Sequence, residues 1–150
     1  MAQIRILVAD DHELVRRGIV AVLATQADFH VVSEAATGVE AITKAGQFQP
    51  DVVLLDISMP ALNGLAAIPV IKECAPQAHI IIVTDFDSAA FSRQAFAAGA
   101  RAFVPKAHVA RKLVTAVREV VASEKRLDEQ LKEVTEMLPD SRPPSAAQND

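Results

Sequence analysis

The chain has 150 residues, of which 51% are hydrophobic and 23% are charged, and this composition suits one globular domain with a substantial core. Its formal net charge of −4 at pH 7 argues against a broad basic surface, so we expect no nucleic acid to bind through this segment. One cysteine, Cys74, and apolar runs far shorter than a bilayer needs exclude an internal disulfide and a membrane span, which predicts a cytoplasmic protein without a membrane partner.

Five short apolar or β-branched runs alternate with amphipathic stretches of helical length. The runs are Ile4–Ala9, Phe29–Ala35, Val52–Asp56, Ile80–Thr84 and Ala102–Pro105. Strands that alternate with helices and are apolar on both faces form parallel sheets with helices on both sides. The sequence therefore predicts an α/β fold with a doubly wound, five-stranded parallel sheet.

Local signals mark three of the helices between these strands. The stretch "TGVE", Thr37 to Glu40, is a capping box that predicts the start of the second helix. Gly99 predicts the end of the fourth helix. Pro69 falls inside the stretch where the third helix is expected, so we predict that this helix starts late or kinks there.

Polar residues stand where most of these strands end. Asp10 and Asp11 follow the first strand, Asp56 and Thr84 end the third and fourth, and Lys106 follows the fifth. Ligands of open α/β sheets bind beyond the carboxyl ends of the strands, so these side chains are candidates for one site. Three neighbouring carboxylates repel one another unless a cation lies among them, and oxygen ligands of this kind suit Mg²⁺. Mg²⁺ and the lysine together balance the three negative charges and leave the site ready for an anion.

The stretches "VADDH", "VVLLDISMPALNG", "IIVTD" and "GARAFVPKA" resemble, in this order, the motifs of the receiver domain of two-component response regulators. The resemblance covers about the first 120 residues. The opening and final motifs are most similar to the branch of receivers that usually precedes a LuxR-type helix-turn-helix. The resemblance implies a flavodoxin-like receiver fold.

The resemblance also implies a phosphorylation site with a bound cation. It assigns Asp56 as the phosphoacceptor, which takes a phosphoryl group from a histidine kinase or a phosphotransfer protein. It implies that Asp11 binds Mg²⁺ directly and that Asp10 helps through water. Asp56 itself and the main-chain carbonyl of Ser58 complete the implied metal ligands.

Three further residues have roles implied by the family. Thr84 hydrogen-bonds the new phosphoryl oxygen, Lys106 pairs with the phosphoryl group, and Phe103 takes the place of the aromatic residue that turns inward on activation. Simpler structural roles stay open for each position. Thr84 can merely end a strand, Lys106 can be a solvated surface residue, and Phe103 can pack in the core. Asp56 can likewise be an ordinary turn residue.

Asp85 departs from the family pattern, in which the residue after Thr84 is usually small. A carboxylate there would restrain phosphorylation by repelling the phosphoryl donor. The open alternatives are that it caps the following helix or contacts Lys106. Ser58 and Phe86 occupy the positions that affect the lifetime of the phosphoryl group in relatives.

The histidines give no sign of a metal site. They show no metal-ligand spacing and are interpreted as surface or loop residues: His12, His30, His79 and His108. An alternative role for His12 or its neighbour Asp11 is to cap the first helix.

An apolar seam predicts that the last helix outruns the domain. Its positions alternate spacings of four and three: Leu113, Val117, Val120, Glu124, Leu127, Leu131, Val134 and Leu138. We predict a receiver domain over residues 1–122, a helical extension over 123–138 and a disordered tail over 139–150. The extension either forms a coiled coil in a homodimer or folds back on its own domain.

Three classes of function fit an α/β sheet with this acidic edge. The first is a phosphorylation-controlled switch rather than an enzyme, which is either free-standing or the input half of a LuxR-type transcription regulator. The second is a Mg²⁺-dependent phosphohydrolase of the haloacid-dehalogenase type, but that class needs its nucleophile on the first strand and a second acid two residues later. The third, a flavodoxin-like cofactor binder, needs a phosphate-cradling first loop, and "DDHE" would repel phosphate unless a cation lay between them. The sequence favours the first.

Overall fold

A computed structural model describes residues 3–57, 64–85 and 89–137 of the chain. Strands and helices alternate along it. The elements are β1 (Ile4–Ala9), α1 (Glu13–Leu23), β2 (Phe29–Ala35), α2 (Gly38–Phe48), β3 (Val52–Leu55), α3 (Gly64–Cys74), β4 (His79–Thr84), α4 (Ala89–Ala98), β5 (Ala102–Pro105), a 3₁₀ turn (Lys106–His108) and α5 (Val109–Met137). The predicted strands are confirmed, apart from shifts of one residue at the end of β3 and the start of β4.

The strands form one parallel sheet in the order β2-β1-β3-β4-β5. The central strand β3 lies between β1 and β4, and each of its four residues is buried. Because all five strands run in the same direction, their carboxyl ends meet at one edge of the sheet. The predicted doubly wound α/β fold is confirmed.

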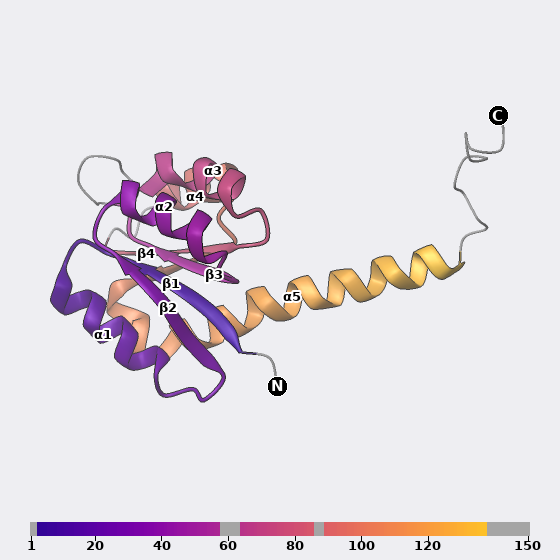
Figure 1. Cartoon of the computed structure of the whole chain (residues 1–150), viewed down its shortest axis with the longest axis horizontal. Helices are drawn as coiled ribbons and strands as arrows, with labels where there is room; N and C mark the ends of the chain where they lie inside the picture. Colours follow the sequence, from indigo (N-terminus) through magenta and orange to yellow (C-terminus); the bar gives the residue numbers. More distant parts are fainter. Residues whose placement is uncertain (1–2, 58–63, 86–88, 138–150) are drawn as a thin grey trace.

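Two layers of helices cover the sheet. Helices α2, α3 and α4 lie on one face and α1 and α5 on the other, as Figure 1 shows. Successive strand residues point to opposite faces, so Leu54 packs toward α1 and α5 while Leu55 packs toward α2 and α3. Because both faces of the sheet are covered by helices, a strand such as β3 has apolar residues at every position.

The helix boundaries follow local rules, with one correction. The hydroxyl of Thr37 accepts a hydrogen bond from the main-chain N–H of Glu40 at 3.1 Å, which is one half of the predicted capping box. Gly99 has φ +123°, a left-handed conformation that suits glycine and ends α4. Of the two outcomes predicted for Pro69, the late start of α3 is wrong, since the helix begins at Gly64 and contains Pro69, and a kink there stays a prediction.

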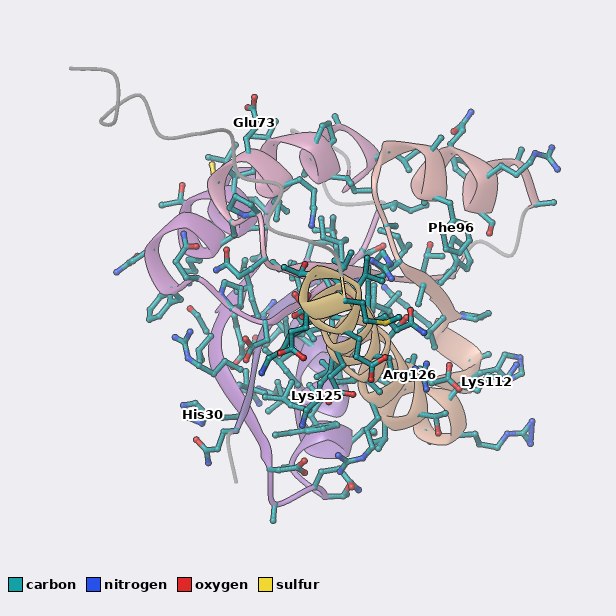
Figure 2. The ribbon with its side chains drawn as sticks, turned by 90° about the vertical axis from the view of Figure 1, so that its right-hand side faces the viewer. His30, Glu73, Phe96, Lys112, Lys125 and Arg126 are labelled. Carbon is teal, nitrogen blue, oxygen red and sulfur yellow. The ribbon has the colours of Figure 1, made fainter. Side chains whose placement is uncertain are left out.

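Helix α5 runs well past the sheet, as the predicted extension requires. Leu113, Val117 and Val120 are buried, and the seam then emerges to solvent, where Leu131 is 57% exposed. Figure 1 shows this end of α5 projecting from the body, and Figure 2 looks along it. None of the helices in the described ranges is both long and apolar enough to cross a membrane. The predicted disordered tail and Leu138 lie outside the described residues.

His79 corrects the interpretation of the histidines as surface or loop residues. It begins β4, is 6% exposed, and its Nε2 lies 2.7 Å from Oε2 of Glu124 on α5. Its other ring nitrogen, Nδ1, is buried without a hydrogen-bond partner among the described residues. Glu124 is the charged position in the apolar seam of α5, so this contact gives that position a polar partner where the helix leaves the domain.

Candidate functional site

Two aspartates meet at the carboxyl edge of the sheet because their strands are neighbours. Asp10 follows β1 and Asp56 follows β3. The main-chain hydrogen-bond ladder continues past the strand ends, since Asp10 N–H donates to Ala35 O and Asp56 N–H donates to Ala9 O, both at 3.0 Å. Backbone pairing therefore holds both residues in register in addition to their side-chain contacts.

Lys106, which follows the edge strand β5, places a positive charge beside these carboxylates. Its Nζ lies 2.9 Å from Oδ2 of Asp10 and 3.1 Å from Oδ2 of Asp56. Both aspartates are only 1% exposed. Burial alone lowers the pKa of Lys106, but the Asp10 and Asp56 carboxylates outweigh it, so the pKa lies above the usual lysine value. The lysine therefore stays charged at neutral pH.

Asp11 and His12 complete the acidic loop after β1. Oδ1 of Asp11 is buried without a hydrogen-bond partner among the described residues, although Nδ1 of His12 lies 3.1 Å away. The main-chain N–H of His12 donates to Oδ1 of Asp10 at 2.9 Å. His12 is the N-cap residue of α1, but its side chain makes no capping hydrogen bond, so the alternative of a capping side chain is not supported at this position.

The arrangement of these donors fits a hard divalent cation. One ligand atom from each of Asp10, Asp11, His12 and Asp56 lies within 4.8 Å of the others. Three of the four donors are carboxylates, and within the described ranges the buried Oδ1 of Asp11 has no hydrogen-bond partner, so it has a free acceptor for a cation. Oxygen donors of this kind suit Mg²⁺. Ser58, whose carbonyl is the further predicted ligand, lies outside the described residues.

Thr84, Phe103 and Asp85 lie at or near the same edge. Thr84 ends β4 and is fully buried. Phe103, on β5, is partly buried and packs against the core beneath α2, α3 and α4. Asp85 is exposed just beyond Thr84, and the ion pairs of Lys106 with described residues are with Asp10 and Asp56, not Asp85. Phe86 lies outside the described residues.

Gly64 is a positioning residue that the sequence prediction did not single out. A Cβ at Gly64 would lie 2.6 Å from the carbonyl oxygen of Asp56 and 2.6 Å from Cα of Ile57. The Gly64 N–H also donates to the carbonyl of Ile57 at 3.1 Å. Only glycine lets α3 begin this close to the main chain of Asp56, and the sequence signal is the "NG" whose glycine begins the helix.

Comparison with known proteins identifies the family of the chain. The family model of the response regulator receiver domain matches residues 6–118. The chain belongs to this family. A receiver domain is a signalling switch rather than a classical enzyme.

Relatives of this receiver domain include LuxR-family regulators. The response regulator protein VraR of Staphylococcus aureus is 38% identical over 121 residues, which are 81% of this chain and 58% of VraR. The crystal structure of a LuxR-family two-component response regulator from Aurantimonas sp. SI85-9A1 is 33% identical with a TM-score of 0.77, covering 81% of this chain and 87% of that one. The predicted resemblance to the LuxR branch is confirmed.

A second similar structure contains a phosphorylated aspartic acid. It is a response regulator protein from Burkholderia pseudomallei with a phosphorylated aspartic acid, a calcium ion and citrate. It is 26% identical with a TM-score of 0.71, and the match covers 85% of this chain and 74% of that one. The present chain spans little more than half the length of the curated relatives it matches, 58% in the case of VraR.

Proposed function

We propose that this receiver domain accepts a phosphoryl group on Asp56 from a histidine kinase or a phosphotransfer protein. The observation that carries the proposal is the buried Asp56 carboxylate, which shares the Lys106 ammonium with Asp10 at the carboxyl edge of the sheet. A nucleophile that attacks an anionic phosphoryl group needs positive charge beside it more than it needs proton transfer. Lys106 supplies part of that charge.

The proposed transfer has a simple balance of bonds. A carboxylate oxygen of Asp56 forms a bond to phosphorus while the bond from phosphorus to the donor's nitrogen or oxygen breaks, and the electron pair leaves with the donor. The product is an acyl phosphate on Asp56. Lys106 pairs with the new phosphoryl oxygens, and Thr84 donates a hydrogen bond to one of them.

We propose that Mg²⁺ is the resident cofactor. Asp11, Asp56 and the carbonyl of Ser58 would hold the ion, and Asp10 would hold it through water. When bound, Mg²⁺ neutralises charge on the carboxylates and on the incoming phosphoryl group. The cluster of donors within 4.8 Å supports this assignment, as does the buried Oδ1 of Asp11, which has no hydrogen-bond partner among the described residues.

We propose that phosphorylation is read through Thr84 and Phe103. These residues lie on the neighbouring strands β4 and β5. When Thr84 turns toward the phosphoryl group it leaves space that Phe103, which is only partly buried, can fill. The surface around β5 then changes shape, and a partner protein or an attached output domain responds.

The LuxR-family relatives favour one kind of output. One similar structure is a DNA-binding response regulator of the LuxR family from Staphylococcus aureus. It is 27% identical with a TM-score of 0.72, and the match covers 77% of this chain and 97% of the S. aureus chain. We propose that this chain acts in transcription regulation through a LuxR-type output and that DNA binding falls to that output rather than to this acidic segment. A free-standing module that binds another protein is the alternative.

One experiment separates the function classes. The full chain is incubated with acetyl phosphate and MgCl2, and the intact mass is followed over time. One phosphoryl group per chain supports the receiver function. Repeated turnover without an adduct supports a phosphohydrolase, and no reaction at all supports a cofactor binder.

A further inference from the structure

Arg16 is unusually well buried for an arginine near a helix start. Its side chain is 16% exposed, whereas that of the neighbouring Arg17 is 71% exposed. Both residues lie in the first turns of α1. Arg17 pairs with Glu13 one turn earlier on the same helix at 2.7 Å, an ordinary surface contact. The two adjacent arginines therefore differ in exposure and in the partners of their side chains.

The guanidinium of Arg16 joins two segments that flank the acidic site. Its Nη1 donates to the main-chain oxygen of Asp10 at 2.7 Å, and its Nε donates to Oε1 of Glu34 on β2 at 2.9 Å. The Arg16 N–H also donates to the carbonyl of His12 at 2.8 Å. The guanidinium is planar, and its N–H donors point in fixed directions relative to one another. The hydrogen bond to Glu34 therefore also orients the N–H group that donates to Asp10.

These contacts orient the peptide between Asp10 and Asp11. The N–H of Asp10 is already fixed by Ala35 O on β2, and Arg16 fixes the carbonyl of the same residue. With both main-chain groups of Asp10 held, the peptide that carries Asp11 cannot rotate freely. Oδ1 of Asp11 takes part in no hydrogen bond with the described residues, although Nδ1 of His12 lies 3.1 Å away, and the orientation of this peptide helps to set the direction of the Asp11 side chain.

We propose that Arg16 is a positioning residue for cation binding, which acts by holding the Asp10 carbonyl so that Asp11 points into the site. Glu34 holds Arg16 in turn and offsets its charge, so the effect is one of geometry rather than of added positive charge. The inference rests on the proposed function, because Arg16 is taken to position a ligand of the Mg²⁺ that the acidic cluster is proposed to bind. Groups behind the ligands of a metal site commonly change metal affinity by about 10- to 100-fold when removed.

The test compares four forms of the full chain: wild type, Arg16→Ala, Arg16→Lys and Arg17→Ala. The dissociation constant for MgCl2 is measured by isothermal titration calorimetry at fixed pH and salt. Initial rates of phosphorylation by acetyl phosphate are measured over a range of MgCl2 concentrations. Circular dichroism shows whether each variant is folded. Arg17→Ala is the matched control, since it removes the same side chain from the next position.

We expect Arg16→Ala to raise the MgCl2 dissociation constant about tenfold and to raise the MgCl2 concentration for half-maximal phosphorylation by the same factor. The rate at saturating MgCl2 should change less than about threefold, because the nucleophile is untouched. Arg16→Lys keeps the positive charge but lacks the planar pair of N–H donors, so its MgCl2 affinity should stay below that of wild type. If Arg16→Ala does not fold, Arg16→Lys tests the role of Arg16 instead. Arg17→Ala should match wild type.

Three results would overturn the inference. They are a dissociation constant for folded Arg16→Ala within twofold of wild type, full recovery of affinity in Arg16→Lys, or an equal loss in Arg17→Ala. The wild-type measurements keep the two proposals apart. If wild type binds no MgCl2 and takes up no phosphoryl group, the proposed function itself fails. If wild type does both and Arg16→Ala behaves like it, only the role of Arg16 fails.

Discussion

The Nζ of Lys106 lies 3.1 Å from Oδ2 of Asp56 and 2.9 Å from Oδ2 of Asp10, so one ammonium joins the ends of β1, β3 and β5. The contact ties together residues that are 50 positions apart or more in the chain. It also places a cation beside the proposed nucleophile before any phosphoryl donor arrives. The same contact therefore serves folding and the proposed chemistry.

The stability supplied by Lys106 should depend on pH in a defined way. Its folded-state pKa is raised above the unfolded value of about 10.4, because the Asp10 and Asp56 carboxylates outweigh burial. Its contribution is therefore fully present below about pH 10 and is lost as pH rises through the folded pKa. We expect Lys106→Met to lower the free energy of unfolding by about 2 kcal/mol at neutral pH, with a difference that shrinks as the pH rises above the unfolded pKa of about 10.4. Urea unfolding of wild type and Lys106→Met at a series of pH values from neutral upward measures this difference. A difference that grows with pH would contradict the pairing of Lys106 with Asp10 and Asp56.

Gly64 and Gly18 make a matched pair for the close approach of α3 to Asp56. A Cβ at Gly64 meets main-chain atoms at 2.6 Å, whereas a Cβ at Gly18 meets nothing within 4 Å. Gly64→Ala should lower the free energy of unfolding by about 1–3 kcal/mol and slow phosphorylation, because the main chain at Asp56 must shift. Gly18→Ala, inside α1, should instead gain about 0.5–1 kcal/mol. Urea unfolding and acetyl phosphate rates check both, and equal behaviour of the two variants would show that the contact is unimportant.

Asp85 should restrain phosphorylation only weakly, because it is exposed. Two unit charges ~6 Å apart interact by roughly 3 kcal/mol at an effective dielectric near 20, and water at the rim reduces this to under ~1 kcal/mol. Asp85→Ala should therefore speed uptake from acetyl phosphate at low salt by about twofold to fivefold, without changing the dependence on MgCl2. Glu73→Ala, which removes the same charge from the exposed end of α3 (Figure 2), is the control. Initial rates that match wild type would leave Asp85 with a structural role.

The apolar end of α5 should hold two copies of the chain together. Leu127, Leu131 and Val134 continue the buried seam but are 53%, 57% and 53% exposed, so a second α5 would cover them. Light scattering should give a dimer for the full chain and a monomer for Leu131→Glu or for a chain cut after Ser123. Glu129→Ala, which is not on the seam, should stay dimeric. Equal masses for the full chain and the cut chain would show that α5 does not dimerise.

The strands and the polar residues at their ends were predictable because each depends on local pattern. A run such as Val52–Leu55, apolar at every position, suits only a strand covered on both faces, and the parallel order then brings Asp10 and Asp56 to one edge. The late start of α3 was a wrong prediction because propensity is a weak guide inside a packed helix. Ala67, Ile68 and Ile71 are buried, and this packing stabilises a helix that Pro69 alone would disfavour.

Side-chain partners that come from distant segments were not predictable. His79 looks like a loop residue in sequence, but its partner Glu124 is 45 positions away on α5. Arg16 and Arg17 are identical residues on one helix, and the placement of β2 beside β1 gives Arg16 its contact with Glu34. Such contacts depend on tertiary geometry that no local pattern contains.

The most direct measurement is the phosphorylation of Asp56. The full chain and Asp56→Asn are incubated with acetyl phosphate and MgCl2, and intact mass and peptide mapping locate any phosphoryl group. The asparagine keeps the shape of the side chain and loses the nucleophile, while Lys106 keeps its partner Asp10, so the variant should fold. We expect one phosphoryl group on Asp56 of the wild-type chain and none on the variant. Labelling of folded Asp56→Asn at the wild-type level would contradict the central assignment.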